Sequence, residues 1–188
     1  MIGRNSRDNA TFNRRVVLTK IVIFGNSGSG KSTLARSISE SLEAGHLDLD
    51  TVAWLPSSPP QRMPIKESME NITSFLNKNT QWVIEGCYAD LISQVTPYAD
   101  EVIFLNLSTS ECIKNAKARP WEPHKYESKA AQDANLNMLL DWITDYDNRT
   151  DTFSRDSHQQ VYDNFDGKKI MVTSNDESKV LRNKTKSN

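Results

Sequence analysis

The chain has 188 residues, with 23 lysines and arginines against 24 aspartates and glutamates and a formal net charge of −1. This length is typical of one domain with a single core, and the balanced charge gives no general affinity for nucleic acid or an anionic membrane. The two cysteines, Cys87 and Cys112, lie in or beside apolar segments and outside any CxxC or Cys/His cluster, so neither a metal site nor a disulfide framework is indicated.

The polar segment 1–14 is expected to be a flexible leader, followed by a single domain over residues 15–182 and a flexible tail over residues 183–188. No apolar run approaches the roughly 18 residues that a membrane-spanning helix needs, and the first residues lack a signal-peptide pattern. We therefore expect a cytoplasmic protein without a membrane partner.

Short runs rich in β-branched and aromatic residues predict five strands, the second of them from a weaker signal. Their apolar character is nearly continuous, which is typical of strands that are covered on both faces. Helical spacing of apolar residues fills the gaps between them, and this alternation predicts an α/β three-layer sandwich with a parallel sheet. The predicted strands are residues 16–24, 46–49, 82–84, 101–105 and 169–172.

A phosphate-binding loop follows the first predicted strand. The sequence GNSGSGKS over residues 25–32 fills every fixed position of GxxxxGK[ST] and leads directly into a predicted helix. A Gly/Ser linker is the plain alternative, but a linker needs no lysine and hydroxyl at a fixed offset. Lys31 can reach the β and γ phosphates, and Ser32 can ligate Mg²⁺. The candidate ATP-binding residues of the loop are Gly25, Asn26, Ser27, Gly28, Ser29, Gly30, Lys31, Ser32 and Thr33.

Two carboxylates end the second predicted strand. Asp48 and Asp50 are two residues apart, so in an extended segment they project to the same side. Beside a phosphate-binding loop, such a pair could hold Mg²⁺ through water and orient an acceptor hydroxyl. A solvated strand end is the alternative interpretation.

Four segments in order resemble the small P-loop kinases, which include adenylate kinase, shikimate kinase and relatives called DNA topology modulation proteins. The segments are IVIFGNSGSGKSTLARSISE, HLDLDTVAW, WVIEGCY, and ADEVIFLNLS followed by a helix that ends in ARP. The resemblance covers residues 18–182, and its first loop is the most specific part. It implies a P-loop NTPase fold of the kinase type, with a five-stranded parallel sheet in the order 2-3-1-4-5, a lid insertion, ATP as the donor, and Mg²⁺.

The same resemblance implies roles for individual residues. Asp48 resembles the acid that contacts Mg²⁺ through water, and Asp50 resembles the acid that grips the acceptor hydroxyl. Glu85 and Gly86 occupy the place of an Asp-Gly pair that borders magnesium and substrate, although a plain strand-end acid is the alternative. Arg119 resembles the arginine that opens the lid and packs against adenine, with a solvated surface role as the alternative.

The chain departs from both named kinases after Gly86. Monophosphate kinases have Phe-Pro-Arg where this chain has Cys87, Tyr88 and Ala89, so an arginine that clamps an acceptor phosphate is missing. Shikimate kinases have three glycines at this point, and residues 85–87 do not match them. Neither acceptor is therefore implied for this chain.

The expected lid spans about residues 119–156 and carries further cations. Arg149 and Arg155 could bind substrate phosphates by excluding water and neutralising charge, although a solvated surface is the alternative for each. For His124 and His158 we expect surface or capping roles, because no acid and nucleophile accompany them at a catalytic spacing.

The sequence thus predicts a kinase that transfers the γ-phosphoryl group of ATP to a hydroxyl or phosphate of a small molecule, with Lys31, Asp48, Asp50 and Arg119 as catalytic residues. A polynucleotide-end kinase is one alternative, against which the balanced charge argues. A nucleotide-binding regulator with little turnover is the other. The sequence leaves the acceptor and the oligomeric state open.

Overall fold

The computed structural model describes residues 19–123 and 126–186, with side chains as far as residue 183, so the expected leader 1–14 lies outside the described residues. The strands are β1 (Lys20–Gly25), β2 (Gly45–Asp48), β3 (Trp54–Leu55), β4 (Gln61–Arg62), β5 (Trp82–Gly86), β6 (Glu101–Leu105) and β7 (Lys168–Val172). The helices are α1 (Lys31–Leu42), α2 (Ile65–Lys78), α3 (Ala89–Val95), α4 (Thr109–Ala118), α5 (Lys129–Ala134), α6 (Leu136–Thr144), α7 (Arg155–Asp163) and α8 (Asn175–Lys186), with short 3-10 turns at η1 (Leu49–Thr51), η2 (Thr96–Tyr98) and η3 (Asp145–Asp147).

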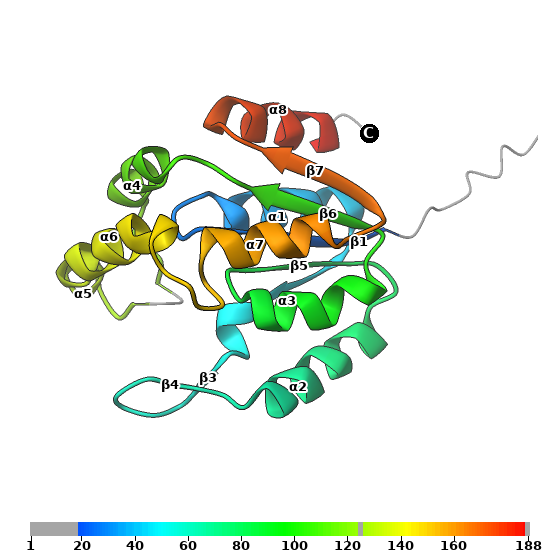
Figure 1. Ribbon diagram of the computed structural model, residues 1–188, viewed down its shortest axis with the longest axis horizontal. Coiled ribbons are helices and arrows are strands. Elements are labelled where there is room, and N and C mark those ends of the chain that lie inside the picture. Colours follow the sequence, from blue (N-terminus) through cyan, green and yellow to red (C-terminus); the bar gives the residue numbers. More distant parts are fainter. Residues whose placement is uncertain (1–18, 124–125, 187–188) are drawn as a thin grey trace, which may run out of the picture.

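A five-stranded sheet in the order β2-β5-β1-β6-β7 forms the centre of the fold (Figure 1). Every neighbouring pair in this sheet is parallel. When its strands are numbered among themselves along the chain, the order is 2-3-1-4-5, so the predicted topology is confirmed. Parallel pairing also brings the carboxyl ends of all its strands to one edge, where ligands bind in open α/β sheets.

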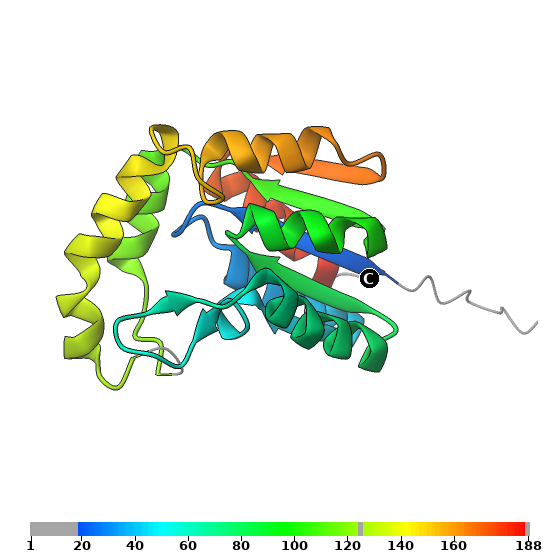
Figure 2. The same cartoon turned by 60° about the horizontal axis from the view of Figure 1, so that its bottom comes forward.

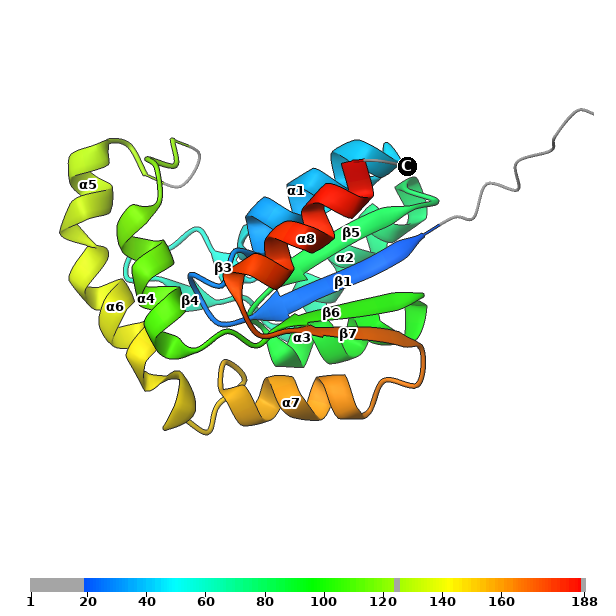
Figure 3. The ribbon, with the colours of Figure 1, turned by 90° about the horizontal axis from the view of Figure 1, so that it is seen from above.

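Helices cover both faces of the sheet, as the continuous apolar runs predicted. Figure 3 shows α1 and α8 on one face and α3 and α7 on the other. Along β1, Val22 and Phe24 belong to one buried cluster while Ile21 and Ile23 belong to the other. Because successive strand residues point to opposite faces, one apolar run supplies both cores.

The boundaries differ from the sequence predictions at several points. The described part of the first strand is Lys20–Gly25, and helix α8 continues past the expected boundary at residue 182 to Lys186. The two-residue strands β3 and β4, which pair antiparallel, were not predicted. Their proline-rich connection hides the short hairpin, since proline is untypical of strands.

Helices α4, α5 and α6 form an arm beyond the carboxyl ends of the strands (Figure 2). Helix α6 packs on α4, and α5 packs on α6. The Asn26 side-chain amide donates to the carbonyl of Ile143 at 3.1 Å, which joins the arm to the loop after β1. The expected lid segment 119–156 includes α5 and α6. Among the described residues, no helix is long and apolar enough to span a bilayer.

The prediction of a surface or capping role is wrong for His158, which is fully buried on α7. Its Nε2 donates to the carbonyl of Cys87 at 3.0 Å, and its Nδ1 accepts from the Tyr146 hydroxyl at 2.7 Å. Because a carbonyl can only accept, Nε2 carries a proton, and in the neutral ring Nδ1 is then the acceptor. Burial is the main cause that lowers the pKa of His158 to about 4. His124 lies outside the described residues.

We predict a pH dependence of stability from His158. Its pKa is lowered from 6.5 to about 4, so the unfolded chain takes up this proton below about pH 6.5 while the folded protein does not. The contribution is complete above pH 6.5 and is lost as pH falls toward 4, by a total of about 3 kcal/mol. Urea unfolding at pH 7.5 and pH 4.5 should therefore show a larger loss for wild type than for His158→Gln. His46 is present in both proteins and cancels, and parallel losses would contradict the assignment.

Candidate active site

The loop between β1 and α1 has three positions whose backbone favours glycine. Gly25, Gly28 and Gly30 have φ angles of +146°, +75° and +91°, which L side chains rarely adopt. A Cβ at Gly25 would lie 2.4 Å from the carbonyl oxygen of Leu105, and a Cβ at Gly28 would lie 2.4 Å from that of Cys112. The loop is therefore pressed against the end of β6 and against α4, while a Cβ at Gly30 would meet nothing within 4 Å.

The geometry of this loop suits a polyphosphate. Helix α1 begins after Gly30 without a side-chain cap, so its first backbone N–H groups remain available to an anion. Lys31 Nζ lies across the loop and donates to the carbonyl of Asn26 at 2.8 Å. Asn115 Nδ2 donates to the carbonyl of Gly28 at 2.9 Å and braces the loop from α4.

The other predicted loop residues differ in exposure. Ser29 is buried and its hydroxyl has no hydrogen-bond partner, whereas Ser27 is half-buried and Thr33 is exposed at the start of α1. An unpaired buried hydroxyl within the loop is consistent with a site that completes its hydrogen bonds with a ligand.

A buried carboxylate, Glu85, lies next to the loop. It is 2% exposed at the end of β5, where the register places it beside Ile23 of β1 and Asp48 of β2. Burial and then the Asp48 charge raise the pKa of Glu85 to about 7, while Lys31 and the Ser32 hydroxyl oppose the rise. The structure thus brings together these groups from α1, β2 and β5.

Glu85 keeps one oxygen, Oε1, buried and without a hydrogen-bond partner. His46 Nε2 is 4.0 Å from it and is itself buried without a partner. Burial is the main cause that lowers the pKa of His46. Because the His46 ring is then neutral, it supplies no positive charge to pair with the Glu85 carboxylate.

The second carboxylate pair has a geometry that sequence reasoning did not predict. Strand β2 ends at Asp48, and Asp50 lies within the 3-10 turn η1 rather than in an extended segment. Asp48 accepts a hydrogen bond from the backbone N–H of Asp50 at 2.9 Å, and Thr51 Oγ1 donates to the Asp48 carbonyl at 2.7 Å. The expectation that both acids project from one side of a strand is therefore wrong, although the turn keeps them adjacent.

Gly86 allows η1 to pack closely on β5. A Cβ at Gly86 would lie 2.9 Å from the side chain of Leu49, which is fully buried. This contact positions the turn that carries Asp50. Gly86 therefore acts on the site through packing.

Oxygen donors near Glu85 suit a hard cation. Ser32, Asp48, Asp50 and Glu85 supply hydroxyl and carboxylate oxygens, the ligands that Mg²⁺ takes in proteins. Within the described ranges there is no group of three or more His, Cys, Asp or Glu side chains arranged to hold a metal by themselves. Mg²⁺ usually keeps several waters and binds phosphate oxygens with one or two protein ligands, so these residues fit a metal that arrives with a nucleotide.

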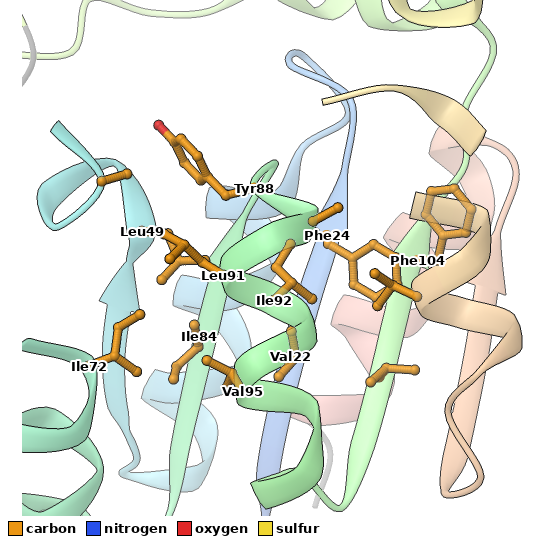
Figure 4. Packing of buried hydrophobic residues seen from close by; sticks show 14 of the residues in the cluster. Val22, Phe24, Leu49, Ile72, Ile84, Tyr88, Leu91, Ile92, Val95 and Phe104 are labelled. Atoms are coloured by element: carbon orange, nitrogen blue, oxygen red, sulfur yellow. The ribbon is translucent and has the colours of Figure 1, made fainter. Parts of the chain in front are cut away.

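Tyr88, which we did not predict as a site residue, connects to Asp50. The Tyr88 hydroxyl donates to Asp50 Oδ1 at 2.6 Å and accepts from Trp54 Nε1 at 2.6 Å. Burial and the nearby Asp50 charge raise the pKa of Tyr88, so it remains a donor. Figure 4 shows its hydroxyl pointing away from the buried aliphatic side chains. Trp54 and Tyr88 both stand in the segments quoted for the family resemblance, but their contact joins residues 34 positions apart.

The three predicted lid arginines lie in different surroundings. Arg119 pairs with Glu122 at 3.0 Å and has its guanidinium carbon 5.6 Å from the centre of the Tyr126 ring. Arg149 stacks on Trp142 with its guanidinium carbon 3.5 Å from the ring centre.

Arg155 pairs with Asp147 and donates to the side-chain oxygen of Asn106, the residue that follows β6. Since β6 lies beside β1, Arg155 is near the strand ends from which the phosphate-binding loop begins.

Comparison with known proteins gives one family and a number of solved structures with a similar fold, two of which are described below. Residues 21–136 match the model of a family described as AAA domain. An unliganded sugar kinase from Janibacter sp. HTCC2649 aligns with a TM-score of 0.51 and 10% identity over 90% of this chain and 93% of that chain. Shikimate kinase from Bacteroides thetaiotaomicron aligns with a TM-score of 0.51 and 11% identity, over 90% and 97%. No curated protein matches the chain in sequence. At these identities the solved structures show a shared P-loop kinase fold.

We predict that two glycines of the loop differ in their tolerance of alanine. Gly30→Ala meets only the cost of a positive φ and should lower the free energy of unfolding by about 1–2 kcal/mol. Gly28→Ala adds a clash with the backbone of Cys112 and should cost roughly twice as much or more. Urea unfolding of both variants measures the difference, and equal losses would show that the close approach at Gly28 is wrong.

Proposed function

The chain belongs to the AAA domain family, whose match contains the whole phosphate-binding loop, and on that premise we propose an ATP-dependent phosphotransferase that acts on a small molecule. The observation that best supports the proposal is that Lys31 and Ser32 of the phosphate-binding loop and the carboxylates of Asp48 and Asp50 all act on the buried carboxylate of Glu85 at the strand ends. A nucleotide-binding loop beside an acid that can orient an acceptor is the minimum arrangement for phosphoryl transfer.

In the proposed reaction, the loop amides and Lys31 bind the β and γ phosphates. An acceptor oxygen, from a hydroxyl or a phosphate, forms a bond to the γ-phosphorus. The bond from that phosphorus to the β–γ bridging oxygen breaks, and ADP leaves with the electron pair. For a hydroxyl acceptor, Asp50 orients the group and accepts its proton as the new bond forms.

Mg²⁺ supplies neutralisation of phosphate charge when it is bound with the nucleotide. Ser32 would ligate it directly, and Asp48 would hold it through water. Glu85 and Gly86 would border the acceptor. These assignments draw on the donor set described above and on the resemblance to small P-loop kinases.

The arginines have separate proposed roles. Arg119 would lie against the adenine, while Arg149 and Arg155 would neutralise charge on the bound substrates. Each now has a carboxylate partner, in Glu122, Asp151 and Asp147 respectively. Movement of the arm of helices on substrate binding would exchange those partners for phosphate oxygens.

We predict that Asp50→Asn separates catalysis from nucleotide binding. The variant keeps the shape of the side chain but loses the proton acceptor, so kcat should fall by about 100-fold or more while the Kd for Mg·ATP stays within about threefold. Transfer from radiolabelled ATP and calorimetry measure the two quantities. Asp141→Asn, at an exposed position on α6, is the matched control. Full activity in Asp50→Asn would exclude this residue from the reaction.

We predict that Lys31→Ala impairs both phosphoryl transfer and the binding of Mg·ATP. Removing the only charge that the loop directs at the phosphates should raise the Kd for Mg·ATP and abolish measurable transfer, whereas Lys66→Ala, at an exposed position on α2, should change neither. A wild-type protein that binds Mg·ATP but phosphorylates no small molecule or oligonucleotide end would favour a regulator over a kinase. Preferential phosphorylation of oligonucleotide ends would favour the polynucleotide alternative.

A further inference from the structure

A cluster of aromatic rings, one buried and three half-buried, lies beside Asp50. Trp54 and Tyr88 meet edge to face at 6.4 Å, Tyr88 and Phe153 at 5.3 Å, and Phe153 and Trp142 at 5.2 Å between ring centres. We call these four residues the aromatic cluster. It draws on β3, the start of α3, α6 and the loop before α7, so its members come from four separate segments of the chain.

Arg62 of β4 lies over this cluster. Its guanidinium carbon is 4.8 Å from the centre of the Tyr88 ring and 5.3 Å from that of Phe153. Its Nε donates to the carbonyl of Ala53 at 3.2 Å, and one terminal nitrogen donates to Asp90 at 3.0 Å. A guanidinium has five N–H groups, so among the described residues an edge of the fork remains open for another acceptor.

Arg149, which follows η3 in the chain, also lies near the Phe153 ring. Its guanidinium carbon is 5.4 Å from the centre of Phe153, and one terminal nitrogen donates to Asp151 at 2.8 Å. The Arg149 side chain is 10% exposed, and its Nε is buried without a hydrogen-bond partner. A buried charged donor without a partner is costly, and an incoming oxyanion would satisfy it.

The arrangement favours an oxyanion over a stacked base. A nucleobase needs an open ring face, and guanidinium groups cover faces of Tyr88, Trp142 and Phe153. The edges of the guanidinium groups match the fork geometry of a carboxylate or phosphate. A nucleoside acceptor without an anionic group would leave these donors unsatisfied.

The Tyr88 ring links this cationic surface to the acid that receives the acceptor. Its hydroxyl contacts Asp50 at 2.6 Å, while its face carries Arg62. A molecule that reached both groups would therefore extend over little more than one aromatic ring. In such a molecule, the hydroxyl at Asp50 and the anionic group at Arg62 would be separated by only a few bonds.

We propose that the acceptor is a small anionic alcohol, whose hydroxyl lies at Asp50 and whose carboxylate or phosphate is bound by Arg62 and Arg149. The proposal rests on the phosphotransferase function proposed above and narrows its acceptor. It makes Arg62, from the proline-rich segment, a residue that determines specificity.

Matched acceptors test the proposal on the wild-type protein. Transfer from radiolabelled ATP is measured for glycerol, glycerate and glycerol 3-phosphate, and for glucose, gluconate and glucose 6-phosphate. In at least one set the anionic member should have a kcat/KM about thirtyfold above its neutral counterpart, the effect of one charge-assisted hydrogen bond. The carboxylated and phosphorylated members distinguish the two kinds of oxyanion.

Variants of Arg62 then test its role in acceptor specificity. Arg62→Gln should raise KM for the preferred anionic acceptor by about thirtyfold, with kcat and the Kd for Mg·ATP within about threefold, and it should leave neutral acceptors unaffected. Arg36→Gln, at an exposed position on α1, is the matched control. Arg62→Lys keeps the charge and much of the packing, so it should give an intermediate KM even if Arg62→Gln does not fold.

Three outcomes overturn the proposal while sparing the phosphotransferase function: transfer to neutral alcohols in preference to their anionic counterparts, transfer to none of the anionic acceptors by a protein that phosphorylates another alcohol, or an unchanged KM in a folded Arg62→Gln variant. Failure of the wild-type protein to bind Mg·ATP overturns the function and the proposal together.

Discussion

The parallel pairing of β5 between β1 and β2 is the constraint on which the site depends. The register sets Glu85 beside Ile23 on one side and Asp48 on the other, one strand away from the loop that follows Gly25. Burying a carboxylate there is costly, and the rise in the pKa of Glu85 to about 7 reflects that cost. Lys31 and Ser32 lie close enough to oppose it. The phosphate-binding loop, the Lys31 ammonium and the carboxylates of Asp48 and Glu85 are thus parts of one electrostatic arrangement.

Much of this arrangement could be predicted from the sequence, because it depends on residues that are close together in the chain. The fixed offset between Gly25 and Lys31 specifies the loop, and an apolar run before it with a helical pattern after it specifies the context. The strand order came from the family resemblance, since local pattern fixes strands but not their neighbours. The turn at Asp50 escaped prediction because Leu49 of η1 packs against Gly86, a contact between distant segments that local pattern does not reveal.

The remaining site residues depend on long-range contacts. Tyr88 was quoted in a segment that resembles a family, yet its role follows from hydrogen bonds to Trp54 and Asp50, 34 and 38 positions away. Arg62 carries no motif and reaches the site through a two-residue strand that propensity cannot detect. His158 looked like a surface residue because polar neighbours surround it in sequence, whereas the face of α7 that it shares with Val161 is turned toward the sheet.

Calorimetric titration of the wild-type protein with a non-hydrolysable ATP analogue tests the central claim most directly. Titrations in Mg²⁺ and in EDTA separate binding by the loop alone from binding that uses the acids beside it. The account predicts uptake of one analogue per chain, with affinity at least about tenfold higher when Mg²⁺ is present. No uptake, or an affinity that Mg²⁺ does not change, would contradict it.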